Sequence, residues 1–290
     1  LMGGLAEAAA SAKDLEAAGY DGAWTAETAH DPFLPLVQAA GDTSSIELGT
    51  SIAVAFARNP MLLANLGWDL QAFSKGRFIL GLGSQIKPHI TKRFSMEWSH
   101  PAPRMREMIN AIRAIWDTWE NGTKLDFRGD FYQHTLMTPF FTPDAADLAG
   151  FGVPKIFIAA VGNLMTEVAG ETCDGVIVHG FTTERYIREV TIPALAKGRE
   201  KAGKTMDGFQ ISGPLFGRRC GRRAAGRLEK LLFVSRPRVQ PADPPVGGSE
   251  MATQAGPRPN SGERETPHAG GVWAAAIDGM APVLAVQALT

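Results

Sequence analysis

Short apolar segments alternate with longer amphipathic segments through the first three quarters of the chain. The short segments are rich in β-branched and aromatic residues, and the longer ones carry apolar residues at helical spacing. Strands followed by helices at this spacing indicate βαβ units and a parallel sheet. We expect strands at 21–27, 46–54, 77–83, 155–162, 174–181 and 209–216. We expect helices at 4–19, 33–40, 59–74, 103–119, 163–171 and 183–203, and a hairpin at 124–137.

Two α/β architectures fit six such strands, a doubly wound open sheet and a (β/α)8 barrel. The barrel is favoured for two reasons. No G-x-G-x-x-G motif opens a helix after the first strand, and polar residues recur where the strands end. Barrel enzymes keep their chemistry at that end of the strands.

The pattern changes abruptly near Gly217. Residues 217–290 contain 10 Lys and Arg against 6 Asp and Glu, and 8 of the 19 prolines. A segment rich in Pro, Gly and Arg without periodic apolar positions is typical of linkers and disordered regions. We therefore divide the chain into a body, 1–216, and a tail, 217–290. Two interpretations of the tail are open: a shift of reading frame, which we favour, and a disordered C-terminal extension.

Composition narrows the function classes. Of the 290 residues, 44% are hydrophobic and 20% charged, which is normal for a chain that buries a core. The net charge of -1 argues against a nucleic-acid or membrane-surface partner. Two cysteines cannot build a disulfide framework, so we expect a cytoplasmic protein without a signal peptide or membrane span. His100 and His134 lack partners at metal-ligand spacing, so no metal site is expected.

Five segments of the body, in order, carry a resemblance to a known family. They are residues 19–33, 46–60, 74–94, 127–141 and 169–180. Together they resemble the luciferase-like flavin and deazaflavin oxidoreductases, and most of all the branch that uses coenzyme F420. The resemblance covers residues 4–216. It implies a TIM barrel, of which this sequence lacks most of strand 1 and strand 8.

The resemblance also implies a function. We expect an oxidoreductase that transfers a hydride between bound F420 and a small organic substrate, with a homodimer as a possible assembly. An FMN-dependent monooxygenase that acts on paired donors with O2 is the first alternative. An inactive barrel remnant is the second.

The loop after the first strand carries the candidate catalytic residues Glu27 and His30. The resemblance implies polar contacts to the deazaflavin ring or the substrate here, and His30 can act as an acid or a base. The alternative is a loop carboxylate and a solvated histidine. Asp31 is expected to cap a helix that begins at Pro32.

The next strand contains a small-residue bend, which suggests a bulge. Here the resemblance implies a non-proline cis peptide between Ser51 and Ile52, backing the central ring of the cofactor. An ordinary strand with a core Ile52 is the alternative.

The strand that ends at Gly83 is followed by Ser84 and Gln85. Gly81 and Gly83 allow close approach of a ligand to the backbone, and Ser84 and Gln85 can donate hydrogen bonds. Gln85 stands where related deazaflavin enzymes can carry an acidic residue.

Two basic residues follow in the same loop. His89 and Arg93 are candidates for contact with the substrate or a phosphate, and a plain surface loop is the alternative.

Two later strand ends complete the candidate cofactor site. Gly162 and Asn163 open a helix, whose free N–H groups can bind the phosphate of the cofactor tail. A plain helix cap is the alternative. His179 and Gly180 can line the same pocket, although His179 can equally fill space at the rim.

Overall fold

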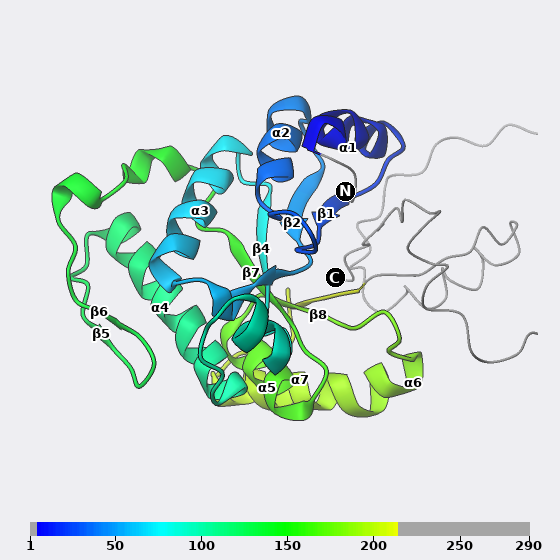
Figure 1. Cartoon of the computed structure of the whole chain (residues 1–290), viewed down its shortest axis with the longest axis vertical. Coiled ribbons are helices and arrows are strands. Elements are labelled where there is room, and N and C mark those ends of the chain that lie inside the picture. The colour runs from blue at the N-terminus through cyan, green and yellow to red at the C-terminus, as the bar shows by residue number, and fades with distance from the viewer. Residues whose placement is uncertain (1–4, 214–290) are drawn as a thin grey trace, which may run out of the picture. The chain divides into compact units, whose positions relative to one another are not determined.

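The six predicted strands form one sheet in which neighbouring strands run parallel (Figure 1). The computed structural model describes residues 5–213, so the prediction for the tail, 217–290, lies outside the described residues. All strands present their carboxyl ends to one side. Within 5–213 the sheet is an open part of a barrel, in which β1 and β9 each pair with one neighbour. The order is β1 (Gly22–Thr25), β2 (Glu47–Thr50), β4 (Phe78–Gly83), β7 (Lys155–Ala159), β8 (Gly175–Ile177) and β9 (Gln210–Ser212).

Helices follow the strands as the periodicity predicts. The Asn59 side chain accepts the N–H of Met61 and caps the third helix. The predicted hairpin is present as the antiparallel strands β5 (Phe127–Arg128) and β6 (Gln133–His134). The helices are α1 (Ala8–Ala17), α2 (Leu34–Asp42), α3 (Pro60–Phe73), α4 (Pro101–Asn121), α5 (Asn163–Thr172), α6 (Glu184–Tyr186) and α7 (Ile192–Lys201).

Several shorter elements have no clear signal in the sequence. Two are π-helical turns, η3 (His89–Arg93) and η6 (Ile187–Thr191), and the second joins α6 to α7. The 3-10 turns are η1 (Leu5–Glu7), η2 (Ala55–Ala57), η4 (Pro139–Phe141) and η5 (Ala145–Leu148).

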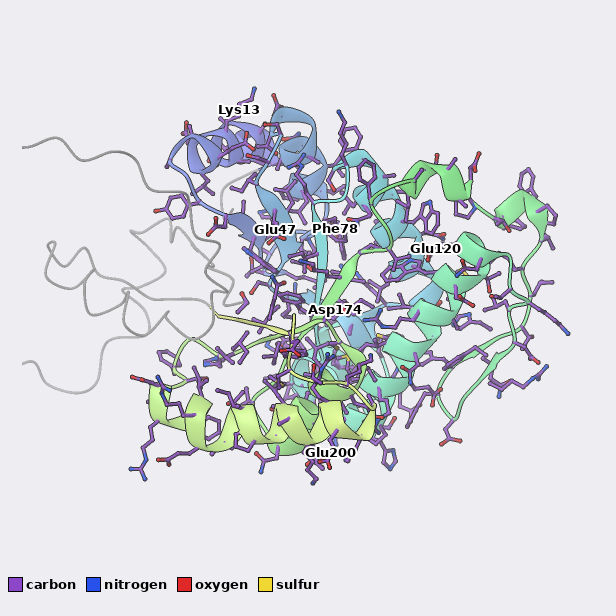
Figure 2. The ribbon with its side chains drawn as sticks, turned by 180° about the vertical axis from the view of Figure 1, so that it is seen from behind. Lys13, Glu47, Phe78, Glu120, Asp174 and Glu200 are labelled. Atoms are coloured by element: carbon purple, nitrogen blue, oxygen red, sulfur yellow. The ribbon has the colours of Figure 1, made fainter. Side chains whose placement is uncertain are left out.

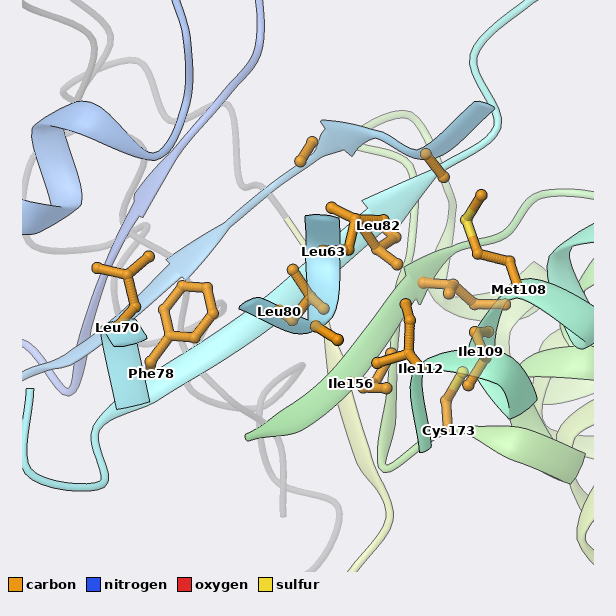
Figure 3. Packing of buried hydrophobic residues seen from close by; sticks show 14 of the residues in the cluster. Leu63, Leu70, Phe78, Leu80, Leu82, Met108, Ile109, Ile112, Ile156 and Cys173 are labelled. Carbon is orange, nitrogen blue, oxygen red and sulfur yellow. The ribbon is translucent and has the colours of Figure 1, made fainter. Parts of the chain in front are cut away.

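The sheet separates two apolar clusters. Alternate residues of β4 point to opposite faces, and Phe78, Leu80 and Leu82 pack against α3 and α4 (Figure 3). Ile79 lies in the other cluster, together with buried residues from β1, β7 and β8: Trp24, Phe157 and Ile177. Because both faces are covered, the strands are apolar throughout, which made them recognisable in the sequence.

Glu16 fastens the turn before β2 to α1. Its carboxylate accepts the backbone N–H groups of Ser44, Ser45 and Ile46, at 2.6–3.2 Å. These hydrogen bonds favour the charged form and lower the pKa of Glu16 to about 2.

This anchor predicts a pH-dependent stability. Because the folded-state pKa of Glu16 is lowered, its stabilisation is complete above its unfolded-state pKa and is lost as the pH falls towards about 2. Glu16→Gln should therefore be less stable than the wild type near neutral pH, with a gap that closes on acidification. Urea unfolding between about pH 7 and about pH 3 measures this gap. Glu120→Gln at the exposed end of α4 (Figure 2) is the control. A gap that stays constant with pH would contradict the assignment.

Candidate functional site

The loops that leave β1 and β2 are tied together at the carboxyl edge of the sheet. Ser51 donates its N–H to the Thr25 carbonyl at 2.6 Å, and Glu27 donates its N–H to the Ile52 carbonyl at 3.1 Å. These bonds extend the parallel ladder past the ends of both strands. The ends of β1 and β2 therefore act as one unit.

The peptide bond between Ser51 and Ile52 is cis, as the family resemblance implies. The predicted strand 46–54 is consequently interrupted and appears as β2 and β3 (Ala53–Val54), both of which pair with β4. Both Ser51 and Ile52 are half-buried.

The glycines of β4 have packing roles within the protein, and their predicted role in ligand approach stays a prediction. A Cβ atom at Gly81 would lie 1.7 Å from the carbonyl oxygen of Thr50. The Thr50 hydroxyl also bonds both the N–H and the carbonyl of Gly81, at 3.0 and 2.6 Å. At Gly83 a Cβ atom would lie 2.8 Å from the Ile52 side chain. Both glycines therefore make room for the neighbouring chain around the cis bond.

Ser84 and Gln85 form a tight turn directly after β4. Gln85 has a left-handed backbone with φ of 59°, and its side-chain oxygen accepts the N–H of Ile86 at 3.1 Å. The Ser84 hydroxyl donates to the Gln85 carbonyl at 3.2 Å. Both side chains are half-buried at the carboxyl edge. Their role in holding the cofactor stays a prediction.

Glu27 forms a buried ion pair with Arg58. Its Oε2 atom accepts the Val54 N–H at 2.7 Å and a guanidinium N–H of Arg58 at 2.5 Å. The two side chains are only 7% and 16% exposed. Arg58 also donates to the Val54 carbonyl. The geometry makes Glu27 an anchor between β1 and β3, and its predicted catalytic role is not tested by these contacts.

Arg58 is the residue of this site that our sequence analysis missed. It follows η2, and its guanidinium also lies 3.3 Å from Asp31. In the sequence Arg58 appears only as a basic residue immediately before the Asn59 cap of α3. That position does not indicate that Glu27, about thirty residues earlier, is its partner.

Asp31 binds the start of α2 in a different way from the one predicted. The helix begins at Leu34 rather than at Pro32. The Asp31 carboxylate accepts the N–H groups of Phe33 and Leu34, at 2.8 and 3.3 Å. His30 is exposed on the loop between the two anchored carboxylates, Glu27 and Asp31.

The helix predicted at Gly162 and Asn163 is present, and α5 begins at Asn163. Gly162 has an extended backbone, is exposed, and provides no side-chain cap for the helix. A Cβ atom at Gly162 would meet no atom of residues 5–213 within 4 Å. The first turn of α5 therefore offers backbone N–H groups at the carboxyl edge, next to the end of β7.

His179 and Gly180 lie just beyond β8. His179 is exposed, and its Nδ1 atom accepts the Phe181 N–H at 3.3 Å while the two rings lie 5.2 Å apart. Of the nine predicted site residues other than Glu27 and His30, Gly83 ends β4 and the other eight follow β2, β4, β7 and β8 on the same side of the sheet. Whether they contact one ligand stays a prediction.

The described part of the chain contains neither a metal site nor a helix that could span a membrane. Residues 5–213 contain no group of three metal-ligating side chains. None of the helices in the same range is long and apolar enough to cross a membrane. Cys173 is buried, and burial raises the pKa of its thiol to about 12, as expected of a packed residue.

Comparison with known proteins agrees with this geometry. Residues 2–217 match the luciferase-like monooxygenase family. The chain belongs to this family. The resemblance inferred from the five segments is therefore confirmed.

Three proteins similar in sequence to this chain illustrate the comparison, one of them uncharacterized and two with named activities. An uncharacterized protein of Mycobacterium tuberculosis is 58% identical over 208 residues, 72% of this chain and 60% of that protein. The F420-dependent glucose-6-phosphate dehydrogenase of Nocardia farcinica is 31% identical, over 63% of this chain and 54% of its own length. The 5,10-methylenetetrahydromethanopterin reductase of Methanolobus tindarius is 32% identical, over 67% of this chain and 55% of its own length. The chain thus spans little more than half the length of these relatives.

Solved structures support the fold. The coenzyme F420-dependent tetrahydromethanopterin reductase from Methanopyrus kandleri superimposes with a TM-score of 0.58 at 20% identity, covering 73% of this chain and 61% of that one. The oxygenating constituent of 3,6-diketocamphane monooxygenase from Pseudomonas putida, in complex with FMN, superimposes with a TM-score of 0.59 at 17% identity. The match covers 70% of this chain and 59% of that one. Both are luciferase-like barrels, so the described sheet is part of a TIM barrel.

The buried pair predicts a large effect of Arg58→Gln. Loss of the guanidinium leaves the Glu27 carboxylate buried without its cation, and we expect the free energy of unfolding to fall by about 3 kcal/mol. Arg128→Gln is the matched control. Its partner is Asp126 and both are exposed, so we expect a change below about 0.5 kcal/mol. Urea unfolding of both variants measures the difference, and equal effects would refute the anchoring role.

Proposed function

We propose that this protein is an oxidoreductase that transfers a hydride between bound coenzyme F420 and a small organic substrate. The observation that carries the proposal is the convergence of the His30 loop, the cis peptide, the turn after β4 and the uncapped start of α5 on one edge of the sheet. A relative named as F420-dependent, the dehydrogenase of Nocardia farcinica, supports the choice of cofactor. We retain the cytoplasm as the location and a homodimer as the assembly, both as proposals.

The residues at this edge fit a deazaflavin with a phosphate-bearing tail. The backbone N–H groups of Gly162 and Asn163 suit a phosphate, because helix N-termini attract anions and no described residue fills the space beside Gly162. Ile52 offers an apolar, half-buried surface for a ring. Ser84, Gln85, His179 and Gly180 supply polar contacts around it. When bound, the deazaflavin would supply the hydride transfer itself.

The chain's own residues then have separate tasks. His30 exchanges a proton with the substrate, since it is exposed on a loop whose flanking carboxylates are already engaged. The Glu27–Arg58 pair holds that loop against β3. The protein therefore positions the reactants, and the cofactor performs the redox chemistry.

An FMN-dependent monooxygenase is the rival within the family, and the solved complex with FMN on the same fold favours keeping it. Parallel titrations of the purified chain with F420 and with FMN, followed by fluorescence, separate the two. Saturable binding of F420 with weaker FMN binding supports the proposal. Preference for FMN overturns it, and binding of neither supports an inactive remnant.

Gly162→Val tests the phosphate end of the site. The backbone of Gly162, with φ of -88° and ψ of 153°, accepts valine, and the added side chain meets no protein atom at its Cβ. The unfolding midpoint should therefore stay unchanged, while F420 binding weakens by about 1–3 kcal/mol through lost charge-assisted hydrogen bonds. Gly162→Ala should have a smaller effect. Unchanged affinity in the valine variant would place the phosphate elsewhere.

His30→Ala should separate turnover from binding. Loss of a proton-exchanging group is expected to lower kcat by about a hundredfold. The dissociation constant of F420 should change by less than about twofold, because His30 is assigned to the substrate. His100→Asn is the control, since His100 is exposed with a left-handed backbone that asparagine tolerates. Equal loss of binding and turnover in His30→Ala would contradict its role.

A further inference from the structure

A basic hollow lies beside the His30 loop. It is a shallow depression, largely open to solvent, with a volume of about 310 Å³, and it is lined by Pro88, His89, Lys92 and Arg93. These residues belong to the π-helical turn η3 and the proline before it, in the loop that follows β4. Gly162 and Asn163, which follow the neighbouring strand β7, are not among the residues that line the hollow.

The turn that forms the hollow is anchored in the core. Ile90 is completely buried, and Phe94 packs against the same apolar cluster. The Phe94 N–H donates to the His89 carbonyl at 3.0 Å, which closes the π turn. His89 and Lys92 are exposed and three positions apart, so they project from neighbouring positions of a fixed backbone.

The positive charge of the hollow has no counterpart in the described residues. Within 5–213, none of the side chains of His89, Lys92 and Arg93, which line the hollow, forms an ion pair. The Arg93 guanidinium donates to the Thr28 carbonyl and lies 4.8 Å from the centre of the Phe94 ring. Both contacts orient the group without neutralising it. Arg58, in contrast, is paired with two carboxylates.

The contact with Thr28 fixes where the hollow lies. Thr28 is two residues before His30, so the cationic side chains border the loop that carries the proposed proton-exchanging group.

We propose that this hollow is a binding subsite for an oxyanion, a carboxylate or a phosphate, carried by the substrate. The proposal deepens the proposed function and rests on it for the identity of the ligand, because it makes the substrate an organic acid or a phosphate ester. Lysine and arginine bind such groups through charge-assisted hydrogen bonds. The phosphate-bearing tail of the cofactor is the other source of the same chemistry.

Calorimetric titration of the 290-residue chain with inorganic pyrophosphate, at constant ionic strength against sodium chloride, tests the subsite. We expect saturable binding that Lys92→Gln weakens by about tenfold. Lys87→Gln removes the same charge from the same loop outside the hollow, and should change the affinity by less than about twofold. No saturable binding, or equal losses in the two variants, would overturn the subsite. Both lysines are exposed, and the unfolding midpoints check that both variants fold.

Two further titrations identify the source of the anion and keep the two proposals apart. If F420 at saturation leaves pyrophosphate binding unchanged, the oxyanion belongs to the substrate. If F420 abolishes it and Lys92→Gln also weakens F420 binding, the anion subsite stands, but the assignment to the substrate is overturned in favour of the cofactor tail. Pyrophosphate binding that depends on Lys92 in a chain that binds no F420 supports the subsite and overturns the proposed function. F420 binding without pyrophosphate binding supports the proposed function and overturns the subsite.

Discussion

The geometry of the site depends on the buried carboxylate of Glu27. Taking a charge out of water is costly unless it is paired and hydrogen-bonded, and Glu27 meets both conditions through Arg58 and the Val54 N–H. Its partners come from β3 and from the segment before α3, and its own backbone N–H bonds the Ile52 carbonyl. One side chain thus holds together the loop after β1 and the strand beyond the cis peptide.

The sheet sets how closely these segments can approach one another. Thr50 and Gly81 lie so close that any side chain at Gly81 would strike the Thr50 carbonyl. On the inner face the rings of Trp24 and Phe157 are 6.0 Å apart, and Trp24 occupies the space beside Gly49. The large ring of Trp24 on β1 therefore packs where the neighbouring strand β2 has the small residue Gly49. This packing fixes the register from which the strand ends, and with them the site, emerge.

The sequence was sufficient for the strands and helices because their signals are local. Both faces of β4 are buried, so it appears as an unbroken apolar run, and Asn59 before Pro60 marks the start of α3. The cis bond at Ser51 came only from resemblance to a family, since nothing in the residue types requires it. The Glu27–Arg58 pair and the Thr50–Gly81 contact escaped prediction. Each joins residues about thirty positions apart, and such partners are decided by the packing of the strands.

The loop that carries His30 is held from two sides by arginines of different segments. Arg58 binds this loop through Glu27 and Asp31, and these ion pairs neutralise the guanidinium charge. Arg93 binds it through the Thr28 carbonyl, a contact that leaves its charge available. The two arginines are therefore not equivalent. Arg58 stabilises the loop by neutralising the buried Glu27 carboxylate and the exposed Asp31 carboxylate, and Arg93 brings to its edge a cation without an acidic partner among residues 5–213. Within the described residues Lys92 and Arg93 lie together beside His89 without an acidic partner, although fixing the loop does not require this, and an acidic ligand would neutralise their charge.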